Sequence, residues 1–565
     1  MDRDGSRSMT MWRWMWYGFL LVPLLFLALF FLYPLLAIFD LSLRPDNSWN
    51  LSGFTQIVTS AYYRDTLIFT IWQAVLSTVL TIGLALPGAY VFTRFDFPAK
   101  SFLLSIATLP FVLPTVVVAT AFSALIGARG IVNQVLMSLF SLETAPIQLE
   151  RTLSIILIVH VFYNYSIALR MITSYWANQS TRIEDAARVL GANGWRIWWH
   201  VRLPMLRPAI LASAILVFIF TFTSFGVVLI LGGIQFATLE VQIYYQALNV
   251  FNLPLAAALS LLQIAVMFAM MLIYTRLQRR ISSVDLQSTR QIARKPKTPF
   301  ERLFLIVNLG TMIVFLFTPL LALIYRSLVR EGAFTLEYYT ALTSNTRNSV
   351  LFAPAIEAIG NSLQFAIITT IAALLLGVLT AYLIAGKGIN RTVSRWLDPL
   401  FMLPLATSAV TLGFGFIIAL DTPPLDLRSS VWLIPIAHTL VAIPFVVRSI
   451  LPALRSIPLH VKESAAILGA PPHRIWWSID LPLLSRGLIV GATFAFTVSM
   501  GEFGASLFVA RPNTPTMPIV IFRLLGQPGA TNYGQALAMS SLLMLVSAAS
   551  FIAIERIRSA GIGEF

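Results

Sequence analysis

The feature that most constrains this chain is its series of long apolar stretches. An α-helix needs about 20 apolar residues to cross the hydrocarbon core of a bilayer, and twelve stretches of the 565-residue sequence reach that length. We therefore expect an all-α polytopic membrane protein with about twelve transmembrane helices. The stretches lie near residues 17–40, 67–93, 102–126, 153–176, 209–233, 254–275, 303–325, 361–386, 396–420, 431–451, 487–510 and 535–554.

The composition excludes several classes of protein. Hydrophobic residues make up 58% of the chain and charged residues 11%, whereas soluble domains carry about 25% charged residues. This excludes a soluble enzyme and a disordered protein. There is no cysteine, which excludes disulfides and thiolate metal ligands, and we expect no metal site. In a membrane protein the net charge of +15 indicates basic cytoplasmic loops, so we expect the lipid bilayer and no nucleic acid as a partner.

The distribution of positive charge predicts the orientation. If the N-terminus is cytoplasmic, the cytoplasmic connections hold 28 of the 39 Lys and Arg residues and the opposite connections hold 10. Positive residues concentrate on the cytoplasmic side of membrane proteins. We therefore expect a multi-pass protein of the cell (plasma or inner) membrane with both termini cytoplasmic. The first stretch has no small-residue cleavage site, so we expect a retained span rather than a signal peptide.

The chain also contains an internal repeat at one fixed offset. A shift of 278 residues aligns two segments without a gap and extends into the neighbouring spans, which indicates a duplicated six-span unit with both halves in the same orientation. We expect a first half at 1–277 (core about 67–275), a basic cytoplasmic linker at 278–300 and a second half at 301–565 (core about 361–555). The shift places Asp185–Gly191 on Glu463–Gly469, Arg196–Trp199 on Arg474–Trp477, Val201–Pro204 on Ile479–Pro482, His160 on His438, Arg170 on Arg448, and Phe225-Gly226 on Phe503-Gly504.

The best-matched part of the repeat lies in polar loops, between spans four and five and between spans ten and eleven. Loops usually drift in sequence, so a retained loop pattern predicts a docking function. The capping-box spacing of Thr181 and Glu184 predicts a helix that begins near Arg182, and Pro204 and Pro482 are expected to end a second helix before the next span. Small residues four positions apart on the first helix predict a face that a partner can approach closely.

The loop pattern resembles the signature loop of the permeases of type I binding-protein-dependent ABC importers. An acidic residue and two alanines are followed after three residues by glycine, and after nine more by Ile/Val-x-Leu-Pro. Asp185 stands where the family has glutamate, and Ser464 replaces the first alanine. The coupling residues that the resemblance implies are Glu184, Asp185, Ala186, Ala187, Gly191, Leu203 and Pro204 in the first loop, and Glu463, Ala465, Ala466, Gly469, Leu481 and Pro482 in the second.

The resemblance implies a fused pair of permease domains, that is, two parallel six-helix repeats of the MetI-like fold. In such importers the loop is a coupling helix that docks into each of two copies of a cytoplasmic ATPase subunit, and an extracytoplasmic binding protein delivers the solute for transport by alternating access. This chain has no Gly-x-x-x-x-Gly-Lys-Ser/Thr phosphate loop. We therefore expect no catalysis and no cofactor in this chain, with ATP and Mg²⁺ bound by the partner ATPase.

In its size and its fused form, the chain resembles the permeases for thiamine and for ferric iron. The segments 224–233, 237–244 and 160–164 resemble the thiamine permease more closely, while polyamine and sulfate importers usually use two separate permease chains. Four polar residues are candidates for the translocation pathway, namely Tyr163, Asn164, Ser224 and Glu502. An intramembrane carboxylate usually faces a cavity or a partner, so Glu502 either contacts a cationic substrate or accepts hydrogen bonds within the bundle.

Two alternatives stay open at this point. An ion-coupled secondary transporter can also consist of two parallel six-helix halves, although Glu502 is its one clear candidate for an ion-coupling acid. A membrane-embedded enzyme needs clustered acids or histidines, and the five histidines are scattered along the chain. The matched pair His160 and His438 could serve a metal or a proton, but a histidine that bonds to a neighbouring helix is the more common arrangement.

Overall fold

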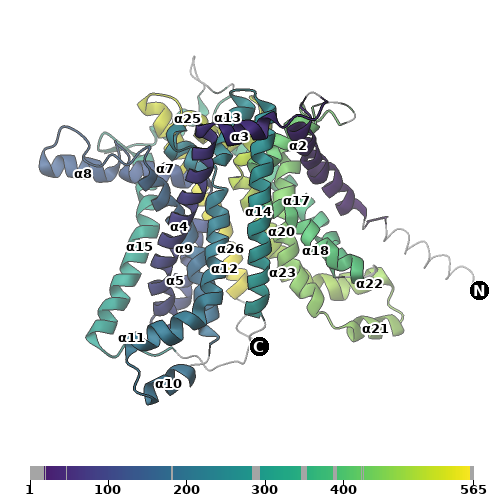
Figure 1. The fold of residues 1–565 in the computed structure, drawn as a ribbon, viewed down its shortest axis with the longest axis horizontal. Coiled ribbons are helices and arrows are strands. Elements are labelled where there is room, and N and C mark those ends of the chain that lie inside the picture. The colour runs from purple at the N-terminus through teal and green to yellow at the C-terminus, as the bar shows by residue number, and fades with distance from the viewer. Residues whose placement is uncertain are drawn as a thin grey trace, which may run out of the picture.

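The computed structural model describes residues 18–19, 21–45, 47–179, 182–282, 293–344, 351, 353–385, 391–421, 423 and 425–559. In this part of the chain, long helices form a bundle, with α10 and α21 at one end and α3, α13 and α25 at the other (Figure 1). Among the described residues, eleven helices are long and apolar enough to cross a membrane, or twelve if one bent pair is a single span. This confirms the predicted polytopic α-helical fold, to which a two-stranded hairpin, β1 (Val329–Arg330) and β2 (Ala333–Phe334), is added.

The first half runs from a membrane-spanning N-terminal helix to a long helix that leads into the linker. Its elements are η1 (Ala28–Leu32), α2 (Tyr33–Leu43), α3 (Ser52–Thr59), α4 (Ala61–Arg94), α5 (Lys100–Ile106), α6 (Leu109–Val112), α7 (Thr115–Ile126), α8 (Ile131–Phe140), α9 (Leu153–Ala177), α10 (Arg182–Val189), α11 (Gly194–Ile197), η2 (Trp198–Arg202), α12 (Leu203–Phe222), η3 (Val228–Gly232), η4 (Ile234–Phe236), α13 (Leu239–Leu248) and α14 (Leu253–Ser282).

The second half repeats this order after the linker. Its elements are α15 (Pro299–Leu328), the β1–β2 hairpin, α16 (Glu337–Thr340), η5 (Ala341–Thr343), α17 (Glu357–Ile384), α18 (Arg391–Ala406), α19 (Ala409–Ala419), α20 (Leu433–Ser456), α21 (Leu459–Ile467), α22 (Pro472–Ile475), η6 (Trp476–Asp480), α23 (Leu481–Gly501), α24 (Gly504–Val509), α25 (Met517–Leu525) and α26 (Ala530–Ser559).

The stretches 102–126 and 396–420 were each expected to be one span, but the structure breaks both of them into separate helices. In the first half Leu113 is extended (φ −71°, ψ 140°) between α6 and α7, because it precedes Pro114 and a residue before proline avoids the helical region. In the second half the helices on either side of the break are bent by 96°. There Ser408 caps α19 by accepting the Thr411 N–H at 3.2 Å.

The fifth span of each half lies earlier in the sequence than predicted. The predicted ranges were 209–233 and 487–510, whereas the helices run over Gly194–Phe222 and Pro472–Gly501. The expectation that Pro204 and Pro482 end a second loop helix before the next span was wrong, because the helix continues through both prolines. A π-helical turn precedes each proline, with Leu203 N–H bonded to Trp198 C=O and Leu481 N–H to Trp476 C=O. Such a turn lets the helix continue through a residue that has no N–H to donate.

The first spanning helix of each half packs against the other half. Helix α2 lies against α19, and α15 lies against α7, while each also contacts the last helix of its own half. The contact is close at Gly415 of α19, where an added Cβ atom would lie 3.1 Å from Pro34 Cβ. The two halves are therefore interlocked at two equivalent places.

Close packing inside the second half gives the first prediction. A Cβ atom at Gly377 of α17 would lie 2.5 Å from Val446 Cγ1 of α20, so we expect Gly377→Ala to destabilise the protein by about 1–3 kcal/mol through overpacking. Gly360 lies on the same helix with no atom within 4 Å of its added Cβ. Gly360→Ala should leave stability unchanged or raise it by up to about 1 kcal/mol, through helix propensity. Thermal unfolding of the detergent-purified variants checks this, and equal shifts would contradict it.

Candidate functional site

The two repeated loops end their short helices in the same way. Gly191 after α10 has φ +80°, and Gly469 after α21 has φ +81°. In each loop the N–H of the next alanine bonds to a carbonyl five residues back, from Ala192 to Ala187 and from Ala470 to Ala465, both at 3.0 Å. This is a Schellman ending, which favours glycine at the left-handed position. No atom lies within 4 Å of an added Cβ at either glycine, so the space beside both is open.

Each short helix presents an aliphatic pair at its tip. Val189 and Leu190 are 88% and 87% exposed, and their equivalents Ile467 and Leu468 are 85% and 88% exposed. Exposed apolar patches of this kind mark interaction sites. These four residues were not among the predicted coupling residues, which differ in their exposure. Asp185, Ala186, Glu463, Ala466 and Pro482 are exposed, while Ala187, Ala465, Leu203, Pro204 and Leu481 are half-buried.

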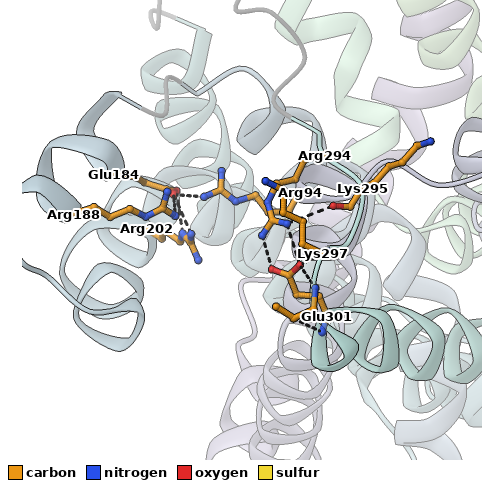
Figure 2. Close-up of polar contacts among 9 residues, drawn as sticks. Arg94, Glu184, Arg188, Arg202, Arg294, Lys295, Lys297 and Glu301 are labelled. Carbon is orange, nitrogen blue, oxygen red and sulfur yellow. Dashed lines mark hydrogen bonds and ion pairs between the residues drawn. The ribbon is translucent and has the colours of Figure 1, made fainter.

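Glu184 lies on the opposite side of α10 and is only 6% exposed. Its Oε1 accepts from Arg202 Nε at 2.9 Å, and its Oε2 accepts from Arg202 Nη2 at 2.9 Å and Arg94 Nη2 at 2.6 Å. Arg188 Nη2 lies 3.8 Å away. Glu184 therefore anchors α10 to the bundle, as Figure 2 shows, and does not point outward with the docking residues. Thr181, its predicted capping partner, lies outside the described residues.

The charges around Glu184 set its protonation. Burial alone would raise the pKa of this carboxyl, but the hydrogen bond from Arg202 and the charges of Arg202, Arg94 and Arg188 outweigh burial and lower the pKa below the usual value of 4.5. The carboxylate is thus ionised at neutral pH. It is held as the anionic centre of a cluster of three guanidinium groups.

The described end of the basic linker lies beside this cluster. Arg294 N–H donates to Arg94 C=O, and Asp96 N–H donates to Arg294 C=O, both at 3.0 Å. The Arg294 side chain donates to Glu301 Oε2 at 3.0 Å, and Glu301 forms a capping box with Thr298 at the start of α15. In Figure 2, Arg94 lies between the Glu184 and Glu301 groups. The linker therefore ties the end of α4 to the beginning of the second half.

A cavity of about 370 Å³ lies between the two halves. All four predicted pathway residues, Tyr163, Asn164, Ser224 and Glu502, line it, although whether they contact a transported solute stays a prediction. Phe225 and Phe503, which the 278-residue offset relates, stack with their ring centroids 5.6 Å apart. Two equivalent residues can touch each other only close to the pseudo-two-fold axis that relates the halves. The cavity lining includes both rings, so this axis passes beside the cavity.

The polar groups of the cavity bond to the broken helices. Tyr163 OH donates to the carbonyls of Leu113 and Pro114, at 3.2 and 3.1 Å. Glu502 accepts the N–H groups of Ala505 and Ser506, both at 2.9 Å, at the start of α24. These contacts favour the interpretation of Glu502 as an acceptor within the bundle. Glu502 nevertheless also lines the cavity.

Each of the two matched histidines lies between two serine hydroxyls, and His438 Nε2 also lies 3.4 Å from Glu502 Oε2. His160 lies 3.3 Å from Ser77 Oγ through Nδ1 and 2.8 Å from Ser224 Oγ through Nε2. His438 lies 2.8 Å from Ser499 Oγ and from Ser506 Oγ through the same two nitrogens. Each ring nitrogen thus has a serine partner on a neighbouring segment. Within the described part of the chain, no group of three or more acids and histidines could hold a metal ion.

Sequence reasoning missed Glu240 of α13 as a site residue. It lines the cavity and is fully buried. Its Oε2 accepts from Ser408 Oγ of the second half at 2.8 Å, and its Oε1 accepts from Gln263 of α14. Glu240 therefore connects the two halves at the break of the ninth span. The one signal was an acid between apolar residues in a stretch too short to be a span, and such a stretch does not indicate how deep the acid lies in the membrane.

Known proteins show the same division of the chain into two related halves. A family model described as "binding-protein-dependent transport system inner membrane component" matches residues 77–283 and again 373–559, together more than two thirds of the chain. A thiamine transport system permease protein of Haemophilus influenzae is 27% identical over 495 residues, covering 86% of this chain and 87% of its own.

Of two further relatives, one matches nearly the whole chain and the other matches about half of it. A probable ABC transporter permease protein of Sinorhizobium fredii is 25% identical and covers 96% of both chains. A putative 2-aminoethylphosphonate transport system permease protein of Salmonella paratyphi A is 27% identical over 251 residues, which is 43% of this chain and 90% of its own. A relative of half the length agrees with a duplicated unit.

The Glu184 cluster predicts a pH dependence. Because the folded pKa is lowered, the carboxylate adds stability that is fully present above its unfolded pKa of 4.5 and is lost as the pH falls through the folded value. At pH 7, Glu184→Gln should cost about 3 kcal/mol, since it leaves buried guanidinium groups unpaired. The difference from wild type should shrink at pH 4, as measured by thermal unfolding.

The neighbouring acid provides the control. Asp185 pairs with Arg188 at 3.3 Å, but both side chains are at least half exposed, and exposed pairs contribute at most about 1 kcal/mol. Asp185→Asn should therefore change the unfolding temperature little at either pH. An equal effect of the two substitutions would contradict the anchoring role of Glu184.

Proposed function

Because the chain belongs to the family of binding-protein-dependent transport system inner membrane components, we propose that it is the permease subunit of an ATP-driven importer for thiamine. The family implies an ATPase and a solute-binding protein as partners. The observation that carries the proposal is the pair of repeated loops at one end of the bundle, each with an exposed aliphatic tip (Figure 1). One permease chain with two such loops suits two copies of one ATPase subunit, one for each loop.

The charge distribution supports the orientation of this assembly. The loops with α10 and α21 belong to the set of connections that holds 28 of the 39 basic residues, the set expected on the cytoplasmic side. The ATPase subunits then bind at this end, and the binding protein binds at the end formed by α3, α13 and α25. Both termini are cytoplasmic in this arrangement.

The central cavity supports a cationic aromatic cargo. Six phenylalanines line it, and a cation is attracted to the face of an aromatic ring. The lining also holds the carboxyl groups of Glu240 and Glu502, and none of the described lining residues is lysine or arginine. Thiamine carries a positively charged thiazolium ring beside a pyrimidine, whereas a phosphonate is anionic. The phenylalanines are Phe111, Phe220, Phe225, Phe445, Phe494 and Phe503.

The position of the cavity supports alternating access. It lies beside the pseudo-two-fold axis, and helix breaks of both halves line it. Movement of one half relative to the other would open it to one side of the membrane and close it to the other. In the proposed order of steps, the binding protein delivers the solute, and the solute passes through this cavity. The ATPase then returns the permease to its starting conformation through α10 and α21.

The docking part of the proposal predicts the effect of a double substitution. Leu190→Asp with Leu468→Asp should abolish co-purification of the ATPase subunit, because each change places a charge in an apolar contact. Both residues are more than 85% exposed, so the permease itself should still fold. Phe334→Asp is the control, since Phe334 is 72% exposed on the β1–β2 hairpin, away from the loops. Retention of the ATPase by the double variant would disprove docking at these tips.

The transport part is tested in liposomes that hold the permease, its ATPase and its binding protein. We expect labelled thiamine to accumulate only with ATP, and an ion gradient not to replace ATP. Phe494→Ala should raise the thiamine KM about fivefold, which corresponds to the loss of one cation–π contact. Phe496→Ala is the control, because Phe496 lies on the same helix but outside the cavity lining.

Two outcomes of the liposome experiment would contradict the proposal. Uptake driven by an ion gradient alone would support the secondary transporter. Uptake of 2-aminoethylphosphonate in preference to thiamine would show that the cargo assignment is wrong.

A further inference from the structure

Each loop helix is joined to the start of the fifth span by one largely buried ion pair, and the charges are reversed between the halves. In the first half Glu184 of α10 bonds to Arg202 of η2, with both contacts at 2.9 Å. In the second half Lys462 of α21 bonds to Asp480 of η6. The 278-residue offset of the repeat relates Glu184 to Lys462 and Arg202 to Asp480. The same two positions thus hold an acid–base pair in one half and a base–acid pair in the other.

A tyrosine from the second span completes each pair. Tyr382 OH, near the end of α17, donates to Asp480 Oδ2 at 2.8 Å. Tyr90, near the end of α4, places its ring 5.5 Å from the Arg202 guanidinium. Each tyrosine follows an alanine, in Ala89-Tyr90 and Ala381-Tyr382. A tyrosine can either donate to a carboxylate or accept a cation on its ring face, so the same residue suits both polarities.

These pairs lie where a movement of the loop helix must pass into the bundle. Glu184 is the buried residue of α10, whereas the tip of that helix is exposed. The partner Arg202 belongs to the helix that continues into the fifth span, and Tyr90 belongs to the second span. Each ion pair therefore joins three elements: the loop helix, span five and span two.

We propose that the two ion pairs are the connections through which each loop helix moves its own half, and that complementarity of charge, not a particular polarity, is what they require. Glu184, Arg202, Lys462 and Asp480 are then positioning residues for transport. This inference rests on the proposed function, because it assigns to these pairs the transfer of motion from the ATPase. Reversing one partner leaves two like charges in a buried site, which is strongly unfavourable.

Among the described residues, two further guanidinium groups lie at the ion pair of the first half, and none of the described second-half residues supplies a positive charge at Asp480 besides Lys462. Arg94 and Arg188 both approach Glu184. The residue 278 positions after Arg188 is Ala466, and Gly386 follows Tyr382 by four positions as Arg94 follows Tyr90. The acid of the first half is therefore surrounded by three cations. A reversed pair should fit the second half but not the first.

The test uses charge reversals in the complete complex, reconstituted with ATPase and binding protein. In the second half, K462E and D480R should each lower the thiamine transported per ATP hydrolysed on the order of tenfold, because each places like charges together. The double variant K462E/D480R should return this ratio to near the wild-type value. It recreates the pair of the first half, with Tyr382 in the place of Tyr90.

In the first half the same exchange should fail. E184K/R202D should stay impaired, because the introduced ammonium group faces Arg94 and Arg188. Addition of R94G and R188A, which copy Gly386 and Ala466, should restore the transport-to-hydrolysis ratio. Thermal unfolding and ATPase retention, measured on every variant, separate loss of coupling from loss of fold.

Three outcomes would overturn the inference. The single reversals could transport as wild type does, or the double variant could be as impaired as the singles. The singles could also lose transport and hydrolysis in equal proportion, as a merely structural role predicts. In each of these outcomes the wild-type complex still binds the ATPase and imports thiamine. Failure of the proposed function is different, because there the wild-type chain itself does neither.

Discussion

Every backbone break inside a membrane must find its hydrogen bonds within the protein, because hydrocarbon offers none. The spans of this chain break after Leu113, before Ser408 and at Glu502, and these breaks meet around one cavity. Tyr163 OH bonds the carbonyls at the first break, the Ser408 hydroxyl caps the second, and the Glu502 carboxylate caps the third. The polar lining of the cavity is therefore a consequence of the broken helices, and the breaks lie where the two halves meet.

The duplicated fold surrounds a cavity that is not symmetric. Val441 lies where the first half has Tyr163, and Ser224 lies where the second half has Glu502. The bond from Ser408 to Glu240 crosses the halves once, since the residue 278 positions after Glu240 is Pro518, which has no side-chain acceptor. Such a cavity suits a cargo without two-fold symmetry, because one chain with two different halves can place different polar groups on the two sides of the axis.

The sequence was sufficient for the helical class, the duplication and the two loops, because these depend on hydropathy and on one fixed offset. It was not sufficient for the breaks at Leu113 and Ser408, since apolar residues on both sides make a broken span look like a straight one. Glu184 illustrates a different limit. Its sequence position among loop residues suggested outward docking, and only the three-dimensional positions of Arg94 and Arg202 show that it anchors the helix from within. Glu240 was missed because depth in the membrane cannot be inferred for a short apolar stretch.

The alignment of the two halves contains one difference that, in sequence alone, suggests a loss of the repeat pattern. Arg202 falls on Asp480, a reversal of charge in an otherwise retained segment. The structure pairs each with a residue that has reversed in the same way, Glu184 in one half and Lys462 in the other. A permease made of two identical chains could not hold both polarities, because each change would appear twice. In a fused chain, the charge on each loop helix needs to be complementary only to the charge at the start of the fifth span in the same half. The two halves can therefore differ in charge while each loop helix stays connected to its span.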